Sequence, residues 1–160
     1  MTDAAFLEDF RRTVDGATDR LLAFSDEEAA RRPAPDKWSR KEIIGHLIDS
    51  ASNNHGRFVR AQMHDHLSFA GYDQDAWVRI QRYQDRPWAD IVRLWQAYNH
   101  HIAHIMAMAD ADARSRPRLE HTLDEIAWET VSAEEATTLD FFMRDYVAHL
   151  KHRLAQTEGG

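Results

Sequence analysis

The stretch Trp38-Ser-Arg-Lys-Glu-Ile-Ile-Gly-His-Leu-Ile-Asp-Ser-Ala-Ser-Asn-Asn-His-Gly-Arg-Phe-Val-Arg-Ala-Gln-Met63 predicts one long helix. Ser39 and Glu42 have the spacing of a capping box, in which each side chain satisfies a backbone N–H group of the first turn. After this start, apolar residues recur at steps of three and four, which indicates one buried face. The apolar positions are Ile44, Leu47, Ile48, Ala51 and Phe58.

A stripe of polar residues borders this face. His46, Asp49, Asn53 and Arg57 follow one another at steps of three, four and four, so they lie along one side of the helix. A histidine beside a buried face, with a carboxylate one turn later, can bind a metal ion or transfer a proton. The alternative is the ordinary polar flank of an amphipathic helix, with His46 hydrogen-bonded to a neighbour.

The length and composition are those of one globular domain over residues 1–160. Hydrophobic residues make up 43% of the 160 residues and charged residues 29%. No apolar run is long enough to cross a bilayer, so we expect no membrane segment. The first residues lack the basic and apolar regions of a secretory signal. We therefore expect a cytoplasmic protein.

Charge and cysteine content exclude several kinds of chemistry. The chain has 20 basic and 27 acidic side chains and a net charge of −7, so nucleic-acid binding is not expected. It has no cysteine, which excludes disulfides, thiolate metal sites and a cysteine nucleophile. Any thiol chemistry would need a thiol supplied by a cosubstrate.

Further apolar stripes predict three more long helices. A stretch of roughly 25 residues, 110–136, separates the last helix from the rest, and connections of that length usually cross a bundle or carry function. The sequence therefore predicts an all-α fold, a four-helix bundle with a long connection before the last helix. The expected helices besides 38–63 are residues 3–24, 26–31, 75–80, 87–109 and 137 or 138 to 156.

Two groups of side chains, one before the third long helix and one within it, leave alternatives open. Tyr72, Trp77 and Tyr83 are large rings in a polar segment, and they either fill one end of the core or line a ligand pocket. His100 and His104 are four residues apart and can share one helix face, where they would hold a metal or remain separate polar residues.

The last helix carries a histidine on its apolar face. Phe142, Tyr146, His149 and Arg153 fall on nearly one line of the helix, and His152 lies about 60° away. If this helix packs beside the 38–63 helix, His149 approaches His46 across the bundle. Metal sites in helical bundles are built in this way, from inward side chains on facing helices.

These residues resemble those of the DinB-like superfamily, which includes metal-dependent hydrolases of the YfiT type. The resemblance covers nearly the whole chain, and its most specific parts are residues 38–57 and 145–154. It implies a four-helix bundle, often dimeric, that binds a divalent ion, zinc or nickel. In such proteins one histidine of the second long helix and two of the last bind the ion. Some relatives are thiol transferases that use bacillithiol, mycothiol or glutathione.

Applied to this chain, the resemblance assigns His46 and His149 as metal ligands. The third ligand of the family commonly stands four residues after the second, in a His-x-x-His-His pattern, where this chain has Arg153. Arginine has no lone pair for a metal, and His152 is the local substitute. The site is then intact with His152, reduced to two histidines and a carboxylate such as Asp49, or lost.

Two functions follow from these alternatives. In the first, a hydrolase or thiol transferase uses the ion to activate water or a cosubstrate thiol. Asp49 would orient a ligand histidine or accept a proton, and Asn53 and Arg57 would contact an anionic small-molecule substrate. In the second, a non-catalytic binding or stress-associated bundle has lost the metal, and Arg153 pairs with an inward carboxylate such as Asp49. The resemblance also leads us to expect a homodimer.

Overall fold

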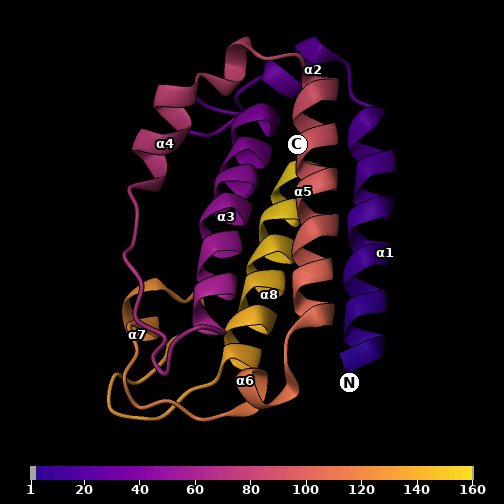
Figure 1. The fold of residues 1–160 in the computed structure, drawn as a ribbon. Helices are drawn as coiled ribbons and strands as arrows, with labels where there is room; N and C mark the ends of the chain where they lie inside the picture. The colour runs from indigo at the N-terminus through magenta and orange to yellow at the C-terminus, as the bar shows by residue number, and fades with distance from the viewer. Residues whose placement is uncertain (1–2, 160) are drawn as a thin grey trace.

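The computed structural model describes residues 3–159 and consists of helices joined by loops (Figure 1). Four long helices form a bundle, which confirms the predicted all-α fold with a long connection before the last helix. Within the described residues the only β-type pairings are isolated bridges. The long helices are α1 (Asp3–Leu22), α3 (Arg40–Ala61), α5 (Trp88–Met108) and α8 (Leu139–Glu158). The short ones are α2 (Asp26–Ala30), α4 (Gln74–Gln81), η1 (Tyr83–Asp85), α6 (Ala111–Ser115) and α7 (Leu123–Ile126).

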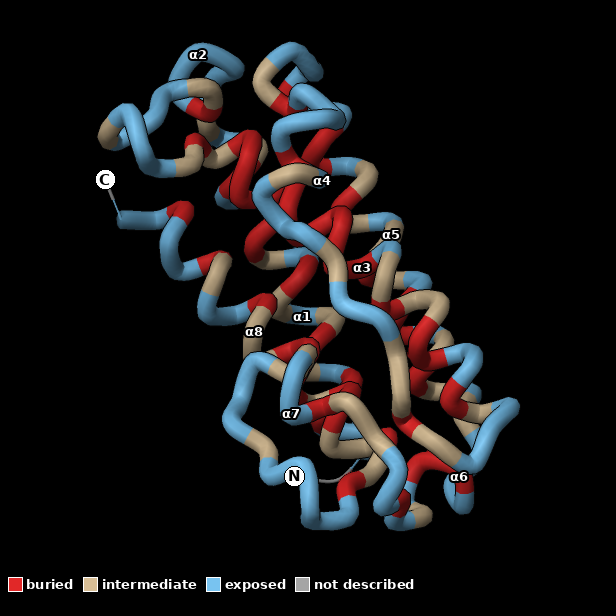
Figure 2. Tube along the Cα trace, turned by 90° about the vertical axis from the view of Figure 1, so that its left-hand side faces the viewer, coloured by how far each residue is buried: buried red, intermediate tan, exposed pale blue. Residues whose placement is uncertain are grey.

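The order and direction of the long helices decide which side chains can meet. α1 and α8 run in one direction and α3 and α5 in the other, so the segment between α3 and α5 returns along the side of the bundle through α4 (Figure 1). α3 packs against both α5 and α8, and α1 packs against α5. Buried positions lie along the facing sides of these helices, while the connections are largely exposed or half-buried (Figure 2). α3 and α8 are therefore antiparallel neighbours.

The capping box at the start of α3 is present as predicted. The Ser39 hydroxyl accepts a hydrogen bond from the Glu42 backbone N–H (3.2 Å), and the Glu42 carboxylate accepts one from the Ser39 N–H (3.0 Å). The helix runs from Arg40 to Ala61, so the predicted limits were two residues too wide at each end. Other limits also moved slightly: Pro87 is the residue before the first turn of α5, and Thr138 caps α8.

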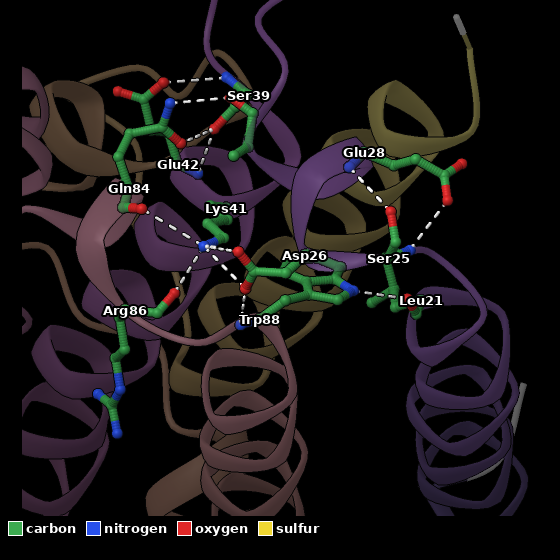
Figure 3. A network of polar contacts seen from close by, with 11 residues as sticks. Leu21, Ser25, Asp26, Glu28, Ser39, Lys41, Glu42, Gln84, Arg86 and Trp88 are labelled. Atoms are coloured by element: carbon green, nitrogen blue, oxygen red, sulfur yellow. Dashed lines mark hydrogen bonds and ion pairs between the residues drawn. The ribbon is translucent and has the colours of Figure 1, made fainter.

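A buried lysine fixes the end of the bundle at which α3 begins (Figure 3). Lys41 is 2% exposed, and its ammonium group donates to the Asp26 carboxylate (3.0 Å) and to the backbone carbonyl oxygens of Arg86 (2.8 Å) and Gln84 (3.3 Å). The Asp26 carboxylate also accepts from the Trp88 backbone N–H (2.8 Å). Because each of these groups is paired, the network joins α2, α3 and the start of α5.

Tyr83 takes the packing role among the three rings between α3 and α5. It is 3% exposed and lies so close to α3 that a Cβ atom on Gly45 would be 2.2 Å from its ring. Only glycine permits this approach. Tyr72 and Trp77 instead pack against each other, with ring centroids 5.2 Å apart.

None of the helices formed by residues 3–159 combines the length and the apolar character that crossing a membrane requires.

Candidate functional site

The rings of His46 and His149 meet between α3 and α8. His46 is in the second turn of α3 and His149 is near the middle of α8, and the packing of these two antiparallel helices brings the rings together. The ring centroids are 5.4 Å apart and the ring planes are nearly perpendicular, at 87°. The approach of the two imidazoles that we expected from the helical spacing is therefore present. Their role as metal ligands stays a prediction.

His46 is a buried imidazole without a hydrogen-bond partner. It is 0% exposed, and neither its Nδ1 nor its Nε2 atom has a partner in the structure. The Trp38 ring also packs against it, with a centroid distance of 5.2 Å. Burial, together with the charges of His149 and Arg153, lowers the pKa of His46 to about 3. A buried polar group normally has a partner, so its two free nitrogens need an explanation.

His149 is half-buried and faces a cavity. Burial, followed by the charges of Arg153 and His152, lowers the pKa of His149 to about 4. At neutral pH both rings are therefore neutral, each with one N–H donor and one lone pair. General acid–base catalysis works best with a pKa near the working pH, so neither ring is well suited to it. A neutral imidazole can bind a metal or hydrogen-bond a ligand.

The cavity beside His149 has a volume of about 280 Å³. Four parts of the chain form its walls: α3, the segment before α4, the segment from α7 to Trp128, and α8. Its size suits a small molecule. The lining residues are Ser50, Asn54, Arg57, Tyr72, Gln74, Glu125, Ile126, Ala127, Trp128, Phe142, Asp145, Tyr146, His149 and Arg153.

Asp145 holds the outer wall of the cavity in place. Both of its carboxylate oxygens accept backbone N–H groups, one from Trp128 and one from Glu129, each at 2.9 Å. Trp128 then lies against both histidines of α8, at 6.4 Å from the His149 ring centroid and 5.2 Å from that of His152. Burial raises the pKa of Asp145. Sequence reasoning did not give Trp128 or Asp145 a functional role, because only the folded chain brings residue 128 back to α8.

Tyr72 forms part of the wall that faces α8. Burial raises its pKa to about 12, so its hydroxyl stays protonated, and the guanidinium group of Arg57 lies 5.8 Å from its ring centroid. Tyr72 thus takes the second role that the sequence left open for the rings of this segment, the lining of a pocket.

In the described residues, no third metal ligand of the kind that the resemblance implies lies beside His46 and His149. His152 is exposed and its ring packs on Trp128, while Arg153 occupies the position four residues after His149. Among residues 3–159 no three or more His, Cys, Asp or Glu side chains form a group that could hold a metal ion. The site offers two adjacent imidazoles, and this set does not complete the three-ligand zinc or nickel site that we expected.

Asp49 is buried close to the histidines but does not bond to them. Its Oδ1 atom accepts hydrogen bonds from the Tyr83 hydroxyl and the Gln81 amide, both at 2.7 Å, and its Oδ2 atom has no partner. Burial raises its pKa. Since neither His46 nitrogen has a partner, Asp49 does not orient that ring through a hydrogen bond. Its catalytic role remains a prediction without a contact to support it.

The expected pairing of Arg153 with Asp49 is wrong. In the described structure Arg153 donates to the Gln156 side chain (3.1 Å), and its guanidinium group lies 5.6 Å from the Trp38 ring centroid. The Asp49 carboxylate is instead engaged by Tyr83 and Gln81 on the α4 side of α3. Arg153 consequently remains beside the histidine pair as a cation, and its charge acts on the pKa of both rings.

The two predicted substrate-binding residues lie in different places. Arg57 lines the cavity with His149 and donates to the Ala70 carbonyl oxygen (2.6 Å). Asn53 donates to the Asp49 backbone carbonyl oxygen (2.9 Å) and borders a separate hollow of about 580 Å³, to which Arg57 also belongs. Of the two, only Arg57 faces the cavity that holds His149.

His100 and His104 make separate contacts. The Nε2 atom of His100 is 2.7 Å from the Asp15 carboxylate of α1, whereas the His104 ring packs near the ring of His101 at 6.3 Å. The spacing of four residues places both histidines on the surface of α5. Each of them contacts a different neighbouring side chain.

Comparison with known proteins agrees with this architecture. The sequence profile of the DinB superfamily matches residues 7–157. The fold is similar to that of YfiT from Bacillus subtilis, which is described as a probable metal-dependent hydrolase with an unusual four-helix bundle topology. The TM-score is 0.77 at 15% identity, over 98% of this chain and 83% of that one. No curated protein sequence is similar enough to count as a match. Since the superfamily profile spans nearly the whole chain, the protein belongs to the DinB superfamily.

Proposed function

We propose that this protein binds a small organic molecule in the cavity between α3 and α8, whose lining includes His149 and Arg153. The observation that carries the proposal is that polar side chains with free hydrogen-bonding capacity line this cavity. The Nε atom of Arg153 is buried without a partner, and the His149 ring contacts that of His46, whose two nitrogens also lack partners. A bound molecule would supply the partners that the chain does not.

The side chains of the cavity have distinct tasks in this proposal. His149 is a neutral ring that can donate or accept one hydrogen bond, and the protonated hydroxyl of Tyr72 can do either. Trp128 covers the outer side and contributes an aromatic surface on which an apolar part of the ligand packs. Asp145 keeps that wall closed through its two backbone hydrogen bonds.

A fragment screen observed by NMR tests the proposal. In protein labelled with ¹⁵N, compounds that bind in the cavity are expected to shift the indole N–H resonance of Trp128. The indole N–H of Trp88 is the internal control, because it donates to the Leu21 carbonyl oxygen (2.7 Å) in the core. A screen in which no compound shifts Trp128, or in which every active compound shifts Trp88 equally, would contradict ligand binding at this site.

The second candidate is a metal-dependent hydrolase or thiol transferase. Two observations favour it: the unpartnered nitrogens of His46 lie beside the ring of His149, and the fold is similar to YfiT, which is described as probably metal-dependent. A divalent ion would supply a Lewis acid that activates water or a cosubstrate thiol. His46 and His149 would hold it, and the remaining ligands would have to come from a rearranged His152 or from the substrate.

Metal analysis separates the two candidates. Under the second, protein purified without a histidine tag should contain close to one zinc or nickel ion per chain, and His46→Ala should remove it. The chain has ten histidines, so the control is the variant His104→Ala, which changes an exposed ring on α5. Equal metal content in the His46 and His104 variants would show that bound metal lies elsewhere, and it would contradict the second candidate.

A further inference from the structure

Two arginines of the cavity have no carboxylate partner. The chain has an excess of acidic residues, and Arg114, Arg116 and Arg144 each form ion pairs with aspartates. Arg57 and Arg153 differ from these. In the part of the chain that the structure describes, they donate hydrogen bonds to amide or carbonyl oxygens, which carry no charge. An acidic protein thus keeps two arginines without an ion pair at one cavity.

Burial makes the lack of a counter-ion significant. Arg57 is 6% exposed, and burial lowers its pKa, which means that the protein environment disfavours its charge. Arg153 is half-buried on Trp38, and its Nε atom is buried without a partner. A buried guanidinium group is costly unless an anion or several acceptors compensate it. The chain itself does not provide that anion at either residue.

The carboxylates of the cavity are not available to these arginines. Both oxygens of Asp145 are bonded to the backbone N–H groups of Trp128 and Glu129. Glu125 is exposed at the outer end of the lining. Asp49 lies behind the wall, where it accepts hydrogen bonds from Tyr83 and Gln81. In the described residues, neither carboxylate of the lining therefore forms an ion pair with Arg57 or Arg153.

We propose that the ligand of this cavity is a small organic anion whose carboxylate or phosphate group is bound by Arg153. The inference rests on the proposed function, that the cavity binds a small molecule. Guanidinium groups bind both kinds of anion through two parallel hydrogen bonds, and the neutral rings of His149 and Tyr72 can add donors beside them. The cation that prevents a third metal ligand thus becomes the main binding group.

The side chains that line the cavity indicate the chemical character of the uncharged part of this anion. Trp128, Tyr72 and Phe142 line the cavity, so an aromatic or other flat apolar body fits between them. A neighbouring hollow of about 620 Å³ shares Gln74 and Arg153 with the cavity and includes Trp38. Arg153 lies between the two spaces, so an anionic group bound there leaves room for a longer substituent over Trp38.

Isothermal titration calorimetry with matched aromatic probes tests the inference. Benzoate and phenyl phosphate carry the two anionic groups, and benzamide is a neutral analogue of benzoate. We expect at least one of the two anions to bind wild-type protein at least about tenfold more tightly than benzamide, because a charge-assisted hydrogen bond contributes more than a neutral one. The tighter anion identifies the charged group that the site prefers.

The variant Arg153→Gln should weaken binding of that anion by about tenfold or more, while benzamide binding stays unchanged. The matched control is Arg12→Gln, which removes an exposed arginine of α1 that pairs only with Glu8. Circular dichroism verifies that both variants fold. Equal anion binding by wild type and Arg153→Gln, or binding of both benzoate and phenyl phosphate no tighter than that of benzamide, overturns the inference.

The result also separates this inference from the proposed function. If neutral fragments shift the Trp128 indole resonance and neither anion binds, the cavity is a ligand site and only its anion preference is wrong. If no fragment of any charge shifts that resonance, both proposals fail.

Discussion

At the scale of single residues, His46 shows how burial sets the charge state of the site. The ring is 0% exposed, and its pKa of about 3 lies far below the ordinary value of 6.5. In the unfolded chain the ring takes up a proton as the pH falls below 6.5, whereas in the folded chain it stays neutral until about pH 3. The unfolded state binds more protons in this range, so acid destabilises the fold.

This difference predicts a measurable loss of stability between pH 7 and pH 5. Protonation of His46 in the unfolded chain should by itself make the free energy of unfolding about 2 kcal/mol lower at pH 5 than at pH 7, since each pKa unit corresponds to about 1.4 kcal/mol. Urea denaturation in buffer with EDTA measures it. His46→Gln should lose this part of the pH dependence, and His104→Gln, which changes an exposed ring, should keep it. An unchanged pH dependence in His46→Gln would contradict the burial argument.

Gly45 offers a second test at this scale. An added Cβ atom would lie 2.2 Å from the Tyr83 ring, and this ring also holds the Asp49 carboxylate through its hydroxyl. Gly45→Ala should therefore destabilise the protein by roughly 1–3 kcal/mol in urea denaturation, as overpacking does.

Gly16→Ala is the control, because it places the same methyl group on a helix where the nearest atom is 3.4 Å away at the end of the Arg20 side chain. This change should stabilise the protein by roughly 0.5–1 kcal/mol, since alanine is the better helix former. Equal effects of the two substitutions would show that Tyr83 is not tightly packed on α3.

At the scale of elements, the start of α3 and the spacing of its apolar face were predictable from the sequence. A capping box and helical periodicity are local patterns, and both are present in the structure. The position of Trp128 was not predictable in this way. It depends on hydrogen bonds between Asp145 and a backbone segment 16 and 17 residues away in the chain, and a single sequence carries no signal for such a contact.

A substitution of Asp145 tests whether its hydrogen bonds hold the segment with Trp128 in place. Asp145→Asn leaves one oxygen where two accept backbone N–H groups, so one of the two hydrogen bonds must be lost. The amide proton that loses its acceptor, that of Trp128 or of Glu129, should exchange with solvent about tenfold faster, which native-state hydrogen exchange measures. The control is Asp19→Asn on the exposed side of α1. Unchanged exchange at both amides would mean that other contacts hold this wall.

At the scale of the whole molecule, helix direction brings the site together. α3 and α8 pack side by side and run antiparallel, so His46, in the second turn of α3, meets His149, near the middle of α8, although 103 positions separate their numbers. The helical spacing predicted that both rings face inward, but not which helices are neighbours. The side chain of Arg153 could not be placed from sequence either, because its direction depends on Trp38 and Gln156. Dimer formation remains a prediction from the resemblance.

The most direct test of the account is zinc binding by Arg153→His, measured by isothermal titration calorimetry. If residue 153 faces the contact between the His46 and His149 rings, a histidine at position 153 adds a third imidazole to the pair. We then expect close to one zinc ion per chain, bound at least about tenfold more tightly than by wild type. The double variant His46→Ala, Arg153→His should lose this gain. If Arg153→His binds zinc no more tightly than wild type, the three side chains do not converge, and the arrangement proposed for this site is wrong.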